Sequence, residues 1–114
     1  MKTWYLACDL KNDPELIKAY ELAHKQVWPK IIQSIYDAGI LNCEIYRVHN
    51  RLLMVLETTD EFSFETKAQM DAINPTVQQW EELMWKYQLA LPEEASTIKW
   101  VLMKQIFSLN DQEN

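Results

Sequence analysis

The first residues of the chain alternate between two faces, which is the pattern of a β-strand. In the segment TWYLACDLK (3–11), one face holds Trp4, Leu6, Cys8 and Leu10, and the other holds Tyr5, Ala7 and Asp9. A period of two places successive side chains on opposite faces of a sheet. The pattern therefore predicts a strand over residues 3–11.

At Pro14 the apolar period changes to that of a helix. Apolar side chains then fall on one stripe, which consists of Leu16, Tyr20, Ala23, Val27, Ile31, Ile35 and Ala38. Asp13 is placed to cap the first turn, and Pro14 occupies the first helical position, where its missing N–H costs nothing. Gly39, the only glycine in the chain, lies where a left-handed C-terminal cap is expected.

Pro29 interrupts this helical pattern. It cannot donate a hydrogen bond to the carbonyl of Lys25, and it disfavours helical geometry at Trp28. We expect the helix to kink or restart there. On a helical wheel, Tyr20, His24 and Trp28 move from the centre of the apolar stripe to its margin.

The remaining segments alternate between β-rich and helical patterns. Strands are predicted at 42–48, 52–59 and 99–109, and helices at 60–73 and from Asn74-Pro75 to Leu91-Pro92. The HNR segment between the second and third strands predicts a hairpin.

The order of these elements, βαββαβ, is typical of the α+β ferredoxin-like fold. In that fold the helices lie on one face of an antiparallel sheet. No repeat or linker divides the chain, so we expect a single domain over residues 1–109 and a frayed tail over 110–114.

Apolar residues occupy both faces of the predicted sheet. Tyr5, Ala7, Val101, Met103 and Phe107 share the register opposite to Trp4, Leu6, Trp100, Leu102 and Ile106. Helices cover one face only, so the second face implies a partner. We expect a homodimer that joins two open faces into a shared barrel. A ligand-filled cavity between sheet and helices would absorb part of the surplus.

The charge balance and the cysteines exclude several classes of protein. With 17 acidic and 11 basic residues and a net charge of −6, the chain lacks the basic stripe that binds nucleic acids or anionic membranes. It has no apolar run long enough to span a bilayer. Asp9 comes too early for a signal peptide, so a cytoplasmic location is expected. Cys8 and Cys43 lack CxxC spacing and are expected to be reduced core thiols rather than metal ligands.

The candidate catalytic group is His24, because the helix margin shelters a side chain and still lets it reach a cavity. His49 lies in the predicted hairpin and is expected to be a turn residue. The sequence has no GxSxG motif and no glycine-rich phosphate loop, and its two histidines belong to different elements. Of the kinds of catalytic site considered, acid–base chemistry on a small neutral ligand remains. The alternative is that His24 has a structural role and no catalytic one.

Several ordered segments together resemble the L-rhamnose mutarotase family. They are YELAHKQVWP, AGILNCEIYR, NRLLMVLE, NPTVQQW and KQIFSL, and the resemblance runs from about residue 5 to residue 109. Its sharpest part is Tyr20-x-x-x-His24 followed by Trp28-Pro29. The resemblance implies a small dimeric α/β-barrel enzyme of ferredoxin-like fold that interconverts sugar anomers without a cofactor.

By position, the resemblance implies that His24 is the proton donor and that Tyr20 binds the sugar. It also implies that Trp80 is the first of two adjacent tryptophans that line the site. Two positions depart from the family. Cys43 stands where a second sugar-binding tyrosine is expected, and Glu81 stands where the second tryptophan is expected. Because both positions would contact sugar hydroxyls, L-fucose becomes a candidate substrate beside L-rhamnose.

The expected reaction exchanges the α and β anomers of a 6-deoxy-L-hexose by proton transfer at the ring oxygen and O1. His24 suits this chemistry because imidazole titrates near neutral pH. Trp80 and Trp28 would stack on the pyranose, and Glu81 is either an additional base or a solvated helix carboxylate. The alternatives are a non-catalytic sugar-binding module and another enzyme of this fold, such as a small monooxygenase or a lactone isomerase.

Overall fold

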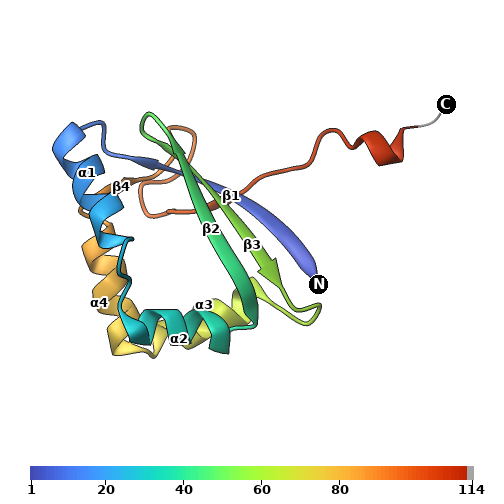
Figure 1. Ribbon diagram of the computed structural model, residues 1–114, viewed down its shortest axis with the longest axis horizontal. Coiled ribbons are helices and arrows are strands. Elements are labelled where there is room, and N and C mark those ends of the chain that lie inside the picture. The colour runs from blue at the N-terminus through green and yellow to red at the C-terminus, as the bar shows by residue number, and fades with distance from the viewer. Residues whose placement is uncertain (113–114) are drawn as a thin grey trace.

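The structure is a computed structural model, and it describes residues 1–112. Its strands are β1 (Lys2–Leu10), β2 (Ile40–Val48), β3 (Arg51–Thr58), β4 (Gln88–Leu89) and β5 (Val101–Leu102). Its helices are α1 (Pro14–Ala23), α2 (Pro29–Asp37), α3 (Phe64–Ala72) and α4 (Pro75–Met84), and a 3₁₀ turn spans Leu109–Asp111 (Figure 1). None of the described helices is both long and apolar enough to cross a lipid bilayer.

The strands form one antiparallel sheet in the order β2-β3-β1-β4, and β5 also pairs with β1. The long β1–β3 ladder places Trp4 opposite Leu56 and Cys8 opposite Leu52. With β1 and β3 at the centre, this is the ferredoxin-like strand order. The predicted α+β ferredoxin-like fold is therefore confirmed.

The helices pack on the sheet face that carries Leu6, Cys8 and Leu10. Two clusters form this core. One contains Leu10, Tyr20, Ile31, Leu52, Val77, Trp80 and Met84, and the other contains Leu6, Ile40, Leu56 and Phe62. In Figure 1 the helices lie to the left of the sheet and below it. The predicted single helix layer is confirmed, and the opposite face of the sheet stays open.

The break at Pro29 is a full restart of the helix. Asp13 caps α1 as predicted, because its Oδ1 lies 2.9 Å from the N–H of Glu15. The helix ends at Ala23, and α2 begins at Pro29 after the segment His24–Trp28. Trp28 has φ −56° and ψ 134°, the extended geometry that a following proline favours. The helical-wheel position predicted for Trp28 was wrong, because α1 ends at Ala23 and Trp28 is not part of it.

Gly39 follows α2 and its cap residue Ala38 with φ +92°, which confirms the predicted left-handed conformation at the end of this helix. A Cβ at this position would lie 3.2 Å from Oγ1 of Thr59, so both backbone conformation and space favour glycine. The hairpin between β2 and β3 is also confirmed, with His49 at φ 51° in its turn.

Two predictions about the C-terminal third were wrong. Helix α4 ends at Met84 rather than near Leu91, because Gln88 and Leu89 pair with the end of β1 as strand β4. The strand predicted over 99–109 is reduced to β5, and its last ladder bond runs from the Met103 N–H to the Tyr5 carbonyl at 2.8 Å.

Beyond Met103 the chain leaves the body of the molecule as an extended arm (Figure 1). Its apolar side chains are exposed, with Ile106 91% accessible, because no described strand runs alongside to pair with them. Residue 110, where the frayed tail was predicted to begin, lies inside the 3₁₀ turn. The last two residues of that tail lie outside the described part of the chain.

Candidate active site

A cavity of about 620 Å³ lies between the sheet and the helices. Its polar wall includes Tyr20, His24, Cys43, Glu81, Gln88 and Lys99, and most of its remaining wall is apolar. The volume falls within the range of small-molecule sites, which combine apolar walls with a few polar groups. Four of the five predicted site residues reach it: Tyr20, His24, Trp80 and Glu81.

His24 is the C-terminal cap residue of α1, directly after Ala23, and its ring is held by the same helix. Its Nδ1 lies 2.9 Å from the carbonyl oxygen of Tyr20, one turn earlier. A carbonyl only accepts hydrogen bonds, so Nδ1 carries the proton and the neutral ring keeps its lone pair on Nε2. Burial lowers the pKa of His24 below its usual value, and the Tyr20 carbonyl offsets this only in part. The imidazole is therefore neutral at pH 7, with Nε2 able to accept a proton.

Aromatic rings surround this imidazole. The His24 ring centroid lies 4.3 Å from that of Tyr20 and 5.5 Å from that of Trp80. Trp28 packs edge-on against Trp80 at 5.1 Å, although it does not form part of the cavity wall and is 36% exposed. Trp28 thus contacts Trp80 but does not itself line the cavity.

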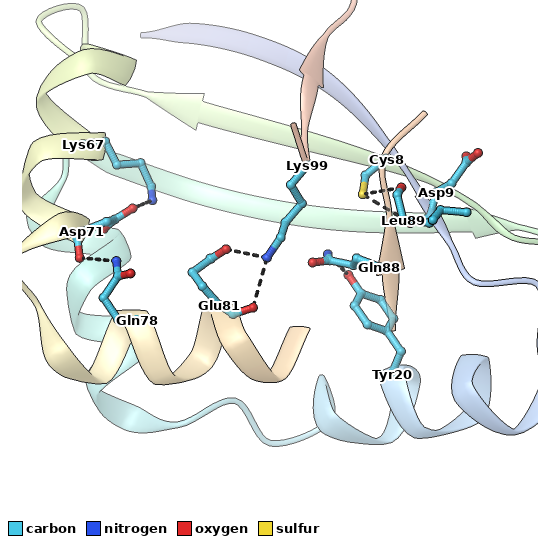
Figure 2. A network of polar contacts seen from close by, with 10 residues as sticks. All are labelled: Cys8, Asp9, Tyr20, Lys67, Asp71, Gln78, Glu81, Gln88, Leu89 and Lys99. Carbon is cyan, nitrogen blue, oxygen red and sulfur yellow. Dashed lines mark hydrogen bonds and ion pairs between the residues drawn. The ribbon is translucent and has the colours of Figure 1, made fainter. Parts of the chain in front are cut away.

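Tyr20 is buried, and its hydroxyl oxygen accepts a hydrogen bond from Nε2 of Gln88 at 3.4 Å (Figure 2). Burial raises the pKa of the phenol, and the Gln88 hydrogen bond lowers it by less. Tyr20 therefore stays protonated at neutral pH and can donate its own O–H.

Glu81 forms an ion pair that the sequence did not reveal. Its Oε2 lies 2.5 Å from Nζ of Lys99, and its carbonyl oxygen lies 3.4 Å from the same nitrogen (Figure 2). The Glu81 side chain is 45% exposed, whereas that of Lys99 is only 10% exposed. Glu81 therefore enters the cavity as half of an ion pair, and neither a lone base nor a merely solvated carboxylate describes it.

The two cysteines are thiols at neutral pH. Burial raises the pKa of Cys8 to about 11, and burial also raises that of Cys43 in the cavity wall. Both are free of disulfide bonds. Within residues 1–112, no three His, Cys, Asp or Glu side chains are grouped to hold a metal ion. The thiol of Cys43 presents a small, weakly polar surface to a ligand.

Comparisons with known proteins agree with this architecture. The model of the L-rhamnose mutarotase family matches residues 4–109. An L-fucose mutarotase from Xanthomonas campestris is 40% identical over 105 residues, which cover 90% of this chain and 84% of that protein.

Two solved structures share the fold. An L-rhamnose mutarotase from Formosa agariphila has a TM-score of 0.69 at 18% identity, and the match covers 96% of this chain and 99% of that chain. A tetracenomycin F2 cyclase from Streptomyces glaucescens has a TM-score of 0.59 at 12% identity, with 95% and 98% covered.

Proposed function

The chain belongs to the L-rhamnose mutarotase family, and from this premise we propose that it interconverts the α and β anomers of L-fucose or L-rhamnose. The observation that carries the proposal is the state of His24. It is a neutral imidazole in the wall of a cavity of about 620 Å³, with Nδ1 engaged and Nε2 left as a base. The roles that follow for the other cavity residues are part of the same proposal.

The reaction needs only proton transfers at two oxygens. As the ring opens, the O1–H proton passes to Nε2 of His24, and the O–H electron pair forms the C1=O1 double bond. The C1–O5 bond breaks, its electron pair goes to O5, and O5 takes up a proton. Tyr20 and Lys99 are O–H and N–H donors in the same cavity. Rotation about C1–C2 and the reverse transfers give the other anomer.

Trp80 supplies the apolar surface for the sugar. The ring is 8% exposed and belongs both to the core and to the cavity wall. The C–H face of a pyranose can pack on its indole while the hydroxyls meet the polar wall. This positions C1 near His24, whose ring contacts Trp80.

Optical rotation after dissolving a pure anomer tests the proposal. We expect faster mutarotation of L-fucose and L-rhamnose than in buffer, with L-fucose exchanged at least as fast. The reason is that Cys43 and Glu81 replace two groups expected to contact hydroxyls, and the 40%-identical relative is an L-fucose mutarotase. D-Galactose, which differs from L-fucose both in hand and in its C6 hydroxyl, tests how narrowly the site selects its sugar. A strong preference for L-rhamnose would contradict the substrate assignment, and no acceleration of any sugar would contradict the activity.

The lowered pKa of His24 predicts the pH dependence. Neutral imidazole is the active form, so the exchange rate should be at its plateau at about pH 8 and fall to half of that plateau only below about pH 6.5. The free energy of unfolding should change with pH in the same direction as the rate. The histidine of the unfolded chain gains its proton at higher pH than that of the folded chain, so stability is lost as the pH falls below about 6.5. The check is a rate profile with the buffer rate subtracted. A catalysed rate that rises toward acid would assign the chemistry to another group.

We also propose that two copies pair through the open face of the sheet. Tyr5, Tyr46 and Val48 are exposed on that face, and Leu53 and Val55 are only half-buried there. The exposed apolar arm beyond Met103 leaves the body beside it. Such a surface is typical of proteins that associate.

Sedimentation at micromolar concentration should give twice the chain mass of 13.6 kDa. Leu53→Asp on the open face should produce monomers, because it would bury a charge in the interface. Leu22→Asp is the matched control, since Leu22 is exposed on α1 and should leave the dimer intact. A wild-type protein that sediments as a monomer contradicts the pairing.

A further inference from the structure

Gln88 has a buried polar atom without a partner. Its side chain is 3% exposed, and no donor within residues 1–112 reaches its Oε1. Its Nε2 is engaged by the hydroxyl of Tyr20. A buried acceptor without a hydrogen bond is costly and rare in folded proteins. Since Gln88 forms part of the cavity wall, a ligand in the cavity can supply the missing donor.

Lys99 brings a cation to the same wall, on a side chain that is largely buried. Its ammonium can donate three hydrogen bonds, and the two that the structure shows both go to Glu81. The ring of Trp85 lies 4.8 Å from Nζ. Burying an ammonium is expensive unless it is paired, and the half-exposed carboxylate of Glu81 meets that requirement while leaving one N–H available.

We propose that Gln88 and Lys99 form a hydroxyl-binding subsite of this cavity, an inference that rests on the proposed sugar substrate. Oε1 of Gln88 accepts a hydrogen bond from one sugar hydroxyl, and Nζ of Lys99 donates one to the oxygen of another. In the view of Figure 2 the Gln88 carboxamide points toward Lys99, with Tyr20 and Glu81 beside them.

Gln88 also orients Tyr20. Because Nε2 of Gln88 donates to the phenol oxygen, the hydrogen of that phenol stays available to the ligand. These three residues thus present one acceptor, from Gln88, and two donors, from Lys99 and Tyr20. This set matches a polyhydroxylated ligand, whose hydroxyls both donate and accept, and it disfavours a flat apolar one, which would leave all three unpaired.

Binding of L-fucose and its 2-, 3- and 4-deoxy analogues to Gln88→Met and Lys99→Met tests the subsite. Calorimetry gives the Kd, independently of any catalysis. We expect a Kd for L-fucose raised about 5- to 10-fold in Gln88→Met and about 10- to 100-fold in Lys99→Met, since a charged donor binds more strongly. For each variant, one deoxy analogue should bind as it does to the wild type, because it lacks the hydroxyl that the lost group contacts.

Arg47→Met is the matched control, because it removes a cation from an exposed ion pair with Glu21, outside the cavity wall. It should bind all four sugars like the wild type. If a methionine variant does not fold, Gln88→Asn or Lys99→Gln replaces it. These variants should show the same differences in affinity between L-fucose and its deoxy analogues. Wild-type affinity for L-fucose in the variants overturns the subsite, as does an equal loss for all four sugars. A wild-type protein that binds L-fucose without accelerating exchange overturns the enzymatic proposal instead.

Discussion

Replacing His24 with alanine should lower the catalysed part of the anomer exchange rate by roughly 10²- to 10⁴-fold, so that the total rate approaches that of sugar in buffer. The imidazole is the group in the cavity wall whose Nε2 is a neutral base at pH 7. Tyr20 is held protonated by burial, and Glu81 is engaged by Lys99, so neither takes its place.

The same substitution should leave the fold intact. His24 lies after the last helical residue of α1 and is only partly buried, and the one side-chain hydrogen bond that it loses is worth about 1 kcal/mol. The matched control is His49→Asn, because His49 has φ 51° in the hairpin turn and asparagine tolerates that conformation. His24→Ala protein that folds and exchanges anomers at the wild-type rate would show that the base lies elsewhere, and one that unfolds would make His24 structural.

Trp80→Ala should produce the largest loss of stability in the site, about 3–5 kcal/mol. The indole belongs to the main core cluster and contacts His24 and Trp28. Its removal would open a cavity under α4 and also remove the apolar wall for the sugar. Urea denaturation measures the loss, with the slope compared between variants to confirm that the unfolded states match.

Trp80→Phe separates the two roles of this ring. The smaller ring keeps much of the packing, so we expect a modest stability loss but a weaker affinity for L-fucose. Trp4→Phe is the matched control, since Trp4 packs against Phe62 and Phe64 in the second cluster and lies outside the cavity wall. Equal effects of the two variants on sugar affinity would contradict the stacking role of Trp80.

Local signals in the sequence were sufficient for much of the fold. The alternation in β1, the Asp13-Pro14 cap and the left-handed Gly39 each act within a few residues, so the pattern predicts them. The same holds for Tyr20 and His24, because a spacing of four residues places them one helical turn apart. Their ring centroids are 4.3 Å apart.

Long-range pairing could not be predicted in this way. Strand β4 is only two residues long and exists because Gln88 and Leu89 meet the end of β1. The contact of Gln88 with Tyr20 joins residues 68 apart, and that of Lys99 with Glu81 joins residues 18 apart. Neither contact leaves a periodic trace in the chain. Gln88 and Lys99 therefore join the polar wall of the cavity only once the structure is known.

The most direct test of the central claim is saturation transfer between the two anomeric protons of L-fucose at equilibrium. Saturating the α-anomer resonance should reduce the β-anomer resonance when a catalytic amount of wild-type protein is present, and not in buffer or with His24→Ala. That result would show anomer exchange that depends on His24. Sugar resonances that broaden with the wild-type protein while no saturation passes between them would contradict the account, and would identify a sugar-binding protein without catalytic activity.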